Sequence, residues 1–133
     1  MNHRFALIWM GCTTFGCWQP VEEEDVATIC VQQSDAFSPL VVFAGGHAIG
    51  SCERNVSYIC EASVHDETLV VHTTVQYEEH VGWCGGPDVA LITGMSPCTE
   101  LEPLDAGTYS IQYAGRTVDV TLPNPDASCD SVL

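Results

Sequence analysis

Eight cysteines and five histidines are the side chains of this 133-residue chain whose types could do chemistry. No two cysteines stand in a Cys-x-x-Cys pair, the spacing that is typical of zinc sites. Cysteines at this density indicate an oxidising compartment and disulfides rather than a metal centre. The candidate disulfide cysteines are Cys30, Cys52, Cys60, Cys84, Cys98 and Cys129.

Six cysteines allow fifteen connectivities, so their pairing is not fixed by the sequence. We favour short bridges between neighbours, because each would close a local loop. The pairs expected on this basis are Cys52–Cys60, Cys84–Cys98 and, joining the two ends of the domain, Cys30–Cys129.

The histidines give a weaker signal. His65, His72 and His80 are seven and eight residues apart and have acidic neighbours. Zinc ligands usually include a closer pair, such as two histidines four apart on a helix. We therefore interpret these histidines as solvated polar positions and predict no metal and no cofactor. A divalent-cation site is the alternative.

No catalytic motif stands out. The loop Gly45–Gly50 is rich in glycine but lacks the Gly-Lys-Ser/Thr ending of a phosphate loop. The sequence has no Gly-x-Ser-x-Gly elbow. The carboxylate runs Glu22–Asp25 and Glu78–Glu79 are typical of solvated faces. We predict a protein that is not an enzyme and has no catalytic residues, with a metal-dependent enzyme as the less favoured alternative.

The charge of the chain excludes one class of partner. Eighteen acidic residues stand against three arginines and no lysine, which gives a net charge of −15. Such a chain cannot neutralise phosphates, so we exclude nucleic acid as a partner. Attraction to an anionic membrane surface is disfavoured for the same reason. A cationic partner is favoured, and the alternative is that the acidity only keeps the protein soluble.

The first sixteen residues have the pattern of an export signal. Arg4 is followed by the apolar stretch Phe5–Met10, which fades into small residues up to Gly16. A positive start, a short apolar segment and small residues before a cleavage site are typical of a secretory leader. We expect residues 1–16 to be a signal peptide.

This beginning resembles that of a bacterial lipoprotein, in which a cysteine after a small residue is lipidated. The candidates are Cys12 in "WMGC" and Cys17 in "TFGC". Lipid attachment at Cys17 is preferred, because it leaves six cysteines and no unpaired thiol. The resemblance implies a lipid-anchored protein of the cell envelope, on the outer membrane since Trp18 follows the cysteine. The acidic residues 17–25 would then be a solvated tether.

Residues 26–133 predict an all-β domain, because short apolar runs alternate with turn residues at the spacing of a sandwich. The expected strands are seven: Val26–Gln32, Leu40–Ala44, Ser57–Val64, Thr68–Tyr77, Val89–Thr93, Gly107–Ala114 and Arg116–Leu122.

Two hairpins have a defined register. In the first, Val64 opposite Leu69 makes one face apolar, and a slip of one residue would exchange the faces. In the second, the turn Ala114–Gly115 joins two alternating runs, where glycine accepts a positive φ.

The segment "LDAGTYSI" resembles the tyrosine corner of immunoglobulin domains, with Asp105, Ala106, Gly107 and Tyr109 matching position by position. Ile111 stands where antibody domains carry a cysteine, so their inter-sheet disulfide is not implied. The resemblance implies a single immunoglobulin-like antiparallel β-sandwich of about seven strands, held by disulfides.

These features predict a monomeric domain with a binding or structural role. The candidate contact loops for a protein or cationic partner are Gly45–Asn55 and Tyr77–Asp88. Trp83 in the second loop could be an exposed anchor, although packing in the core or on a disulfide is the more common fate of tryptophan. The alternative is a secreted, soluble inhibitor or toxin-like protein without a lipid.

Overall fold

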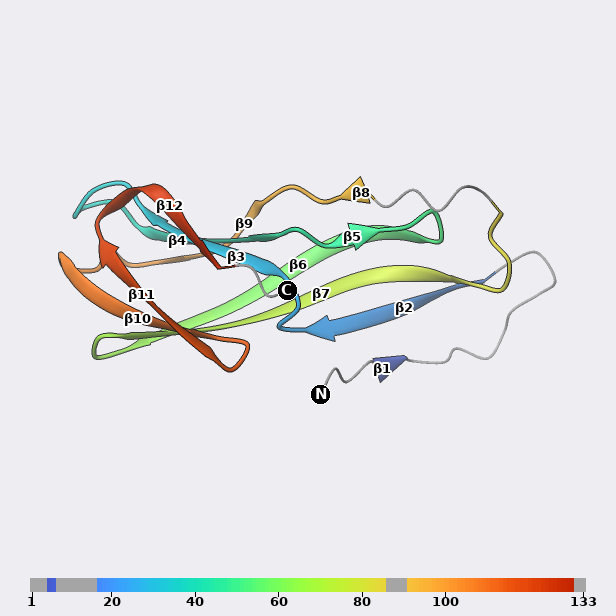
Figure 1. The fold of residues 1–133 in the computed structure, drawn as a ribbon, viewed down its shortest axis with the longest axis horizontal. Coiled ribbons are helices and arrows are strands. Elements are labelled where there is room, and N and C mark those ends of the chain that lie inside the picture. Colours follow the sequence, from blue (N-terminus) through green and yellow to red (C-terminus); the bar gives the residue numbers. More distant parts are fainter. Residues whose placement is uncertain (1–4, 7–16, 86–90, 131–133) are drawn as a thin grey trace.

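The computed structural model describes residues 5–6, 17–85 and 91–130 (Figure 1). This part of the chain is all-β, as predicted, and consists of twelve strands without a helix. Within it, nothing helical is long and apolar enough to cross a membrane. The expected signal peptide lies outside the described residues except for Phe5 and Ala6.

Seven of the strands have six to eight residues, and two are longer. The strands are β1 (Phe5–Ala6), β2 (Cys17–Glu24), β3 (Thr28–Gln33), β4 (Leu40–Gly45), β5 (Ala48–Ile49), β6 (Glu53–His65), β7 (Thr68–Val81), β8 (Leu91–Ile92), β9 (Ser96–Leu101), β10 (Gly107–Tyr113), β11 (Arg116–Leu122) and β12 (Asn124–Asp130).

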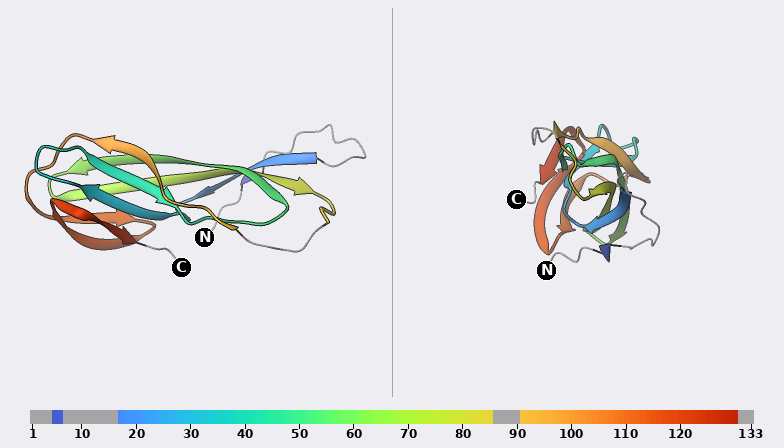
Figure 2. Two further views of the ribbon diagram at one scale, coloured as in Figure 1. Left: turned by 90° about the horizontal axis from the view of Figure 1, so that it is seen from above. Right: turned by 90° about the vertical axis from the view of Figure 1, so that its right-hand side faces the viewer.

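The strands form two main sheets that face each other across a common core (Figure 2). In the first sheet the order is β1-β2-β7-β10-β11, and β6 pairs with the other edge of β7. The second sheet has the order β12-β3-β4-β9, and β5 and β8 form a small ribbon beside it. The core combines fully buried side chains of both sheets, such as Val42 of β4 and Val71 of β7. The sandwich-like all-β prediction is therefore confirmed.

Both predicted hairpin registers are confirmed. Val64 lies opposite Leu69 and Glu61 opposite His72 in the pairing of β6 with β7. The turn of the second hairpin has φ angles of 50° at Ala114 and 74° at Gly115. Positive φ at both central residues is what a tight turn between twisted antiparallel strands requires.

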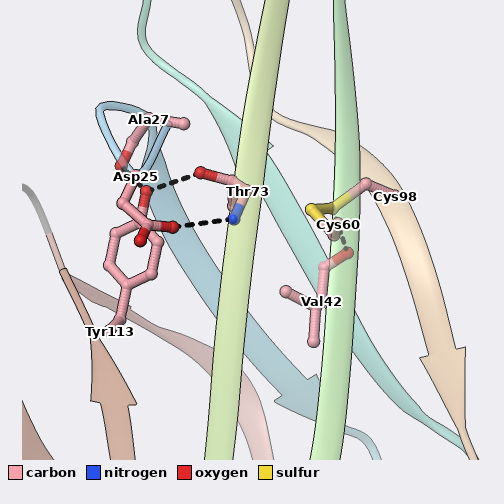
Figure 3. The surroundings of a disulfide bond; sticks show 7 residues. All are labelled: Asp25, Ala27, Val42, Cys60, Thr73, Cys98 and Tyr113. Atoms are coloured by element: carbon pink, nitrogen blue, oxygen red, sulfur yellow. Dashed lines mark hydrogen bonds between the residues drawn. A yellow bond between two sulfur atoms is a disulfide. The ribbon is translucent and has the colours of Figure 1, made fainter. Parts of the chain in front are cut away.

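One pairing departs from the expected antiparallel sandwich. β10 runs parallel to β7 and contacts it only at residues 68–70, whereas β2 pairs with residues 74–81 of the same edge. Asp25 fills the interval, because its N–H donates to the Thr73 carbonyl and its Oδ1 accepts the Thr73 N–H, both at 2.9 Å (Figure 3). The long β7 thus supports two different partners on one edge.

The prediction of an acidic tether over residues 17–25 is wrong. Residues 17–24 form β2, which is paired with β7 along its whole length, and Val21 is buried in the core. Glu22 and Glu24 are exposed on one face of the strand, whereas Val21 and the half-buried Glu23 lie on the other. Residues 17–24 are therefore part of the first sheet, and the folded domain does not begin at Val26.

Three disulfides connect the six predicted cysteines, but two of the expected pairs are wrong. Cys30–Cys129 forms as predicted, whereas the others are Cys52–Cys84 and Cys60–Cys98. Cys52 and Cys60 are eight residues apart along an extended strand, about 25 Å, which no disulfide spans. Because β7 returns antiparallel to β6, Cys84 arrives next to Cys52. Cys60–Cys98 instead joins β6 of one sheet to β9 of the other (Figure 3).

Candidate functional site

The two predicted contact loops lie together at one end of the domain, at the right in Figure 1. The Cys52–Cys84 disulfide connects them, with 5.7 Å between the two Cα atoms. The His80 N–H also donates to the Cys52 carbonyl at 2.8 Å. We call the residues 45–55 and 77–85 the stapled end; residues 86–88 of the second predicted loop lie outside the described part.

Trp83 is exposed at the stapled end. Its exposed fraction is 92%, so it belongs neither to the core nor to the packing of a disulfide. A Cβ atom built on Gly85 would lie 2.5 Å from the Trp83 ring, which means that the ring lies over the Gly85 backbone. The structure therefore favours the less common of the two fates considered for this tryptophan.

A polar network at the stapled end holds Arg54 in place. The Arg54 Nε donates to Glu78 Oε2 at 2.9 Å, and its guanidinium carbon lies 4.0 Å from the centre of the Trp18 ring. The hydrogen bond from Arg54, followed by that from Asn55, holds the pKa of Glu78 below its ordinary value of 4.5. Trp18 contacts His80 edge-on, with 5.1 Å between ring centres. A carboxylate fixed in its charged form is suited to orienting a cation and not to taking up a proton near neutral pH.

The predicted histidine candidates are dispersed. His65 lies opposite Thr68, four residues along β7 from His72, a separation of about 13 Å. His80 packs against Trp18, and His72 Nδ1 lies 3.4 Å from Asp25 Oδ2. Across residues 17–85 and 91–130, no group of three or more histidine, cysteine or acidic side chains could hold a metal ion. The three histidines are therefore not brought together by the pairing of β6 with β7.

His47 occupies the inner side of the stapled end. Its ring lies 4.9 Å from the Tyr77 ring, and its Nε2 is 3.7 Å from Glu53 Oε2. The His47 N–H donates to the Tyr58 hydroxyl at 3.1 Å, and Tyr58 is in turn hydrogen-bonded to Thr93. These contacts connect the β5–β8 ribbon to the first sheet, so they explain the position of His47 without a chemical role.

Cys17, the predicted lipid site, also lies at the stapled end. It is the first residue of β2 and is opposite Val81, two residues before Trp83. Cys17 is disulfide-bonded, and the six downstream cysteines are occupied by their own three bridges. A disulfide and a lipid thioether use the same sulfur atom, so only one of them exists on a given molecule.

Sequence reasoning missed Phe37, which is at the opposite end of the domain. Its side chain is 92% exposed in the turn between β3 and β4. The only signal in the sequence was an aromatic residue inside the turn-forming string "SDAFSP". Exposure of such a residue depends on what the rest of the chain packs against the turn, so no local pattern could show it.

Comparison of the chain with protein-family models, with curated proteins and with solved structures gives no significant match. Any functional argument therefore rests on the geometry described above.

Proposed function

We propose that this chain is an exported, lipid-anchored, monomeric domain of the cell envelope that binds a partner and catalyses no reaction. The observation that carries the proposal is the position of Cys17 as the first residue of β2, a strand that pairs with β7 along its whole length. Lipid attachment there would tether the domain by one end, with no linker between lipid and β2. Removal of residues 1–16 would take away any upstream disulfide partner and leave the sulfur available for the lipid.

Such an anchor would place the stapled end against the membrane. Trp83 and Val81, which is 45% exposed, would then lie at the level of the lipid headgroups. Tryptophan is favoured at that depth, because its ring is apolar and its indole N–H is polar. The opposite end of the domain, which includes the turn between β3 and β4, would face away from the membrane (Figure 1). We place the protein on the outer membrane, as the lipoprotein resemblance implies.

The charge of the anchored domain supports a cationic partner. Residues 17–133 carry two arginines against eighteen acidic side chains, a net charge of −16. One of these arginines, Arg54, is engaged by Glu78 and Trp18. Complementary charge would speed the encounter with a basic partner and disfavour an acidic one.

We also propose that the domain is immunoglobulin-like. The support is the tyrosine corner, since the Tyr109 hydroxyl donates to the Asp105 carbonyl at 2.8 Å.

Labelled palmitate tests the anchor. The wild-type protein should incorporate the label in its host, and Cys17→Ser should lose it, whereas Cys12→Ser serves as the control that keeps it. Equal labelling of wild type and Cys17→Ser would refute attachment at Cys17.

Partner capture from the host envelope tests the binding role. A cationic partner should be retained at low salt and released as salt rises, because exposed charges are screened beyond about 8 Å at physiological ionic strength. Capture that is unaffected by salt would contradict the charge argument.

A soluble secreted protein is the second candidate, and the disulfide on Cys17 favours it. In that case the mature chain would carry no acyl groups. The intact mass of the protein released by its host separates the two candidates, since acyl chains add several hundred daltons.

A further inference from the structure

We propose that the groove beside Phe37 binds a lysine or arginine side chain of a partner protein. This inference rests on the proposed binding of a cationic partner and assigns it to one surface. The β3–β4 turn and the end of β9, which carry the lining residues of the groove, lie at the end of the domain opposite the start of β2, at the left in both Figure 1 and the left view of Figure 2. An anchored domain would present this end to its surroundings.

The turn that carries Phe37 is fixed before any partner arrives. Asp35 Oδ1 accepts the N–H groups of Phe37 and Ser38, each at 2.8 Å. These hydrogen bonds lower the pKa of Asp35 below its ordinary value, the bond from the Phe37 N–H most of all. A preformed turn loses little conformational entropy on binding, which favours its use as a contact surface.

The fully buried side chain of Gln33 connects the two chain segments that carry the walls of the groove. Its Nε2 donates to the carbonyls of Asp35, at 3.0 Å, and Leu104, at 2.8 Å. Its Oε1 accepts the Leu104 N–H at 3.2 Å. Gln33 thus holds the turn and the segment after β9 at a fixed separation, although Leu104 follows Gln33 by 71 residues in the chain. The groove between them is part of the fold and does not depend on a partner.

The lining of this groove matches a long cationic side chain. The groove has a volume of about 430 Å³ and contains three apolar rings and two carboxylates. Its lining residues are Phe37, Pro39, Glu100, Leu101, Glu102 and Pro103. The rings suit the methylene groups of lysine or arginine, and Phe37 can also attract the cation through its ring face. Glu100 and Glu102, both exposed, supply the opposite charge and disfavour an acidic or purely apolar occupant.

The proposal is tested by titrating the ¹⁵N-labelled, disulfide-bonded protein with an N-acetylated trilysine amide at low salt. Amide shifts should concentrate at residues 37–39 and 100–103. Phe37→Ala and the double variant Glu100→Gln/Glu102→Gln should each weaken binding about five-fold, the size expected for losing one cation–π contact or a pair of exposed charges. Glu61→Gln, which removes an exposed carboxylate on β6, is the matched control and should change affinity less than two-fold.

Three results would overturn the groove as the site. These are the absence of shifts at residues 37–39 and 100–103, equal binding of triglutamate, and equal trilysine affinity for the wild type and Phe37→Ala. None of these results bears on the proposed function, which is tested by palmitate labelling and by partner capture. If Phe37→Ala still incorporates palmitate and still captures a salt-sensitive partner from the envelope, then the anchored binding domain stands and only its contact surface is elsewhere.

Discussion

Asp25 and Thr73 are joined by a pair of hydrogen bonds at the point where the pairing partner of β7 changes from β10 to β2. One is an ordinary backbone bond, and in the other the Asp25 carboxylate takes the place of a strand carbonyl. Asp25 has a φ of 51°, because the chain leaves the first sheet here and enters the second through Ala27. The side chain thereby satisfies a buried N–H that the departing strand would leave unpaired, and this requirement leads to a first prediction.

Asp25→Ala should lower the free energy of unfolding by about 1–3 kcal/mol, because the Thr73 N–H loses its acceptor in a half-buried position. Asp25→Asn keeps an amide oxygen there and should cost less. Urea unfolding with intact disulfides measures both. Equal stability of Asp25→Ala and wild type would show that the carboxylate is not needed at the junction.

Tyr109 and Tyr113 provide a graded comparison on one strand. Tyr109→Phe removes the hydroxyl that donates to Asp105 and should cost about 1 kcal/mol of unfolding free energy. The Tyr113 hydroxyl is buried and contacts both the Ala27 carbonyl, at 2.7 Å, and the Thr73 hydroxyl, at 2.8 Å. Tyr113→Phe should therefore cost more, about 1–3 kcal/mol. The reverse order in thermal or urea unfolding would contradict the assigned burial.

The pKa of Glu78 should respond to Arg54. Since the side-chain hydrogen bond from Arg54 lowers this pKa, Arg54→Met should raise it toward 4.5. A depressed folded-state pKa means that Glu78 favours the folded state above its unfolded pKa, and that this contribution is lost as the pH falls through the folded value. The ¹³C shift of the Glu78 carboxyl, followed against pH, measures the change.

Asp35 is the internal control for that titration. Its pKa is lowered by the Phe37 N–H at the other end of the domain and should stay low in Arg54→Met. If both carboxyl groups moved together, the variant would have changed the fold and not one hydrogen bond.

The disulfide connectivity predicts the fragments of the unreduced protein. Cleavage after the acidic residues Asp35, Glu53, Glu61, Asp88 and Asp105 places each of the six cysteines on its own peptide, so the linked peptides report the pairs directly. We expect Cys52 with Cys84, Cys60 with Cys98 and Cys30 with Cys129, and six thiols from these bridges after reduction. A fragment joining Cys52 to Cys60 would restore the pairing that sequence spacing favoured.

The local alternation of apolar and polar residues determined the two hairpins. In β6 and β7 the pattern alone selected the register, because a shift of one residue would bury the Glu61 face. The sequence also determined that the six cysteines pair, but not with whom. Disulfide partners depend on which strands become neighbours, and Cys52 meets Cys84 only because β7 doubles back along β6.

Prolines explain the strands that the sequence did not reveal. β2, β9 and β12 contain Pro20, Pro97 and Pro125, residues that indicate a break when a strand is assumed to be internal. β9 and β12 are the two edges of their sheet. In β2, Pro20 lies opposite Glu78 of β7. Even-numbered residues of β7 direct their N–H groups toward the β6 side, as the hydrogen bond from the His80 N–H to the Cys52 carbonyl shows. The Pro20 nitrogen therefore points away from β7, where no hydrogen bond to that strand is lost.

Whether a proline removes a hydrogen bond between strands thus depends on which side of its strand has a neighbour. That information exists only in the tertiary structure, as does the exposure of Phe37 and Trp83. Composition and local pattern determined an acidic, disulfide-bonded all-β domain, because charge, cysteine content and alternation are properties of the chain itself. The packing of distant segments decided which residues meet at each end of that domain, since those contacts join positions that no local pattern relates.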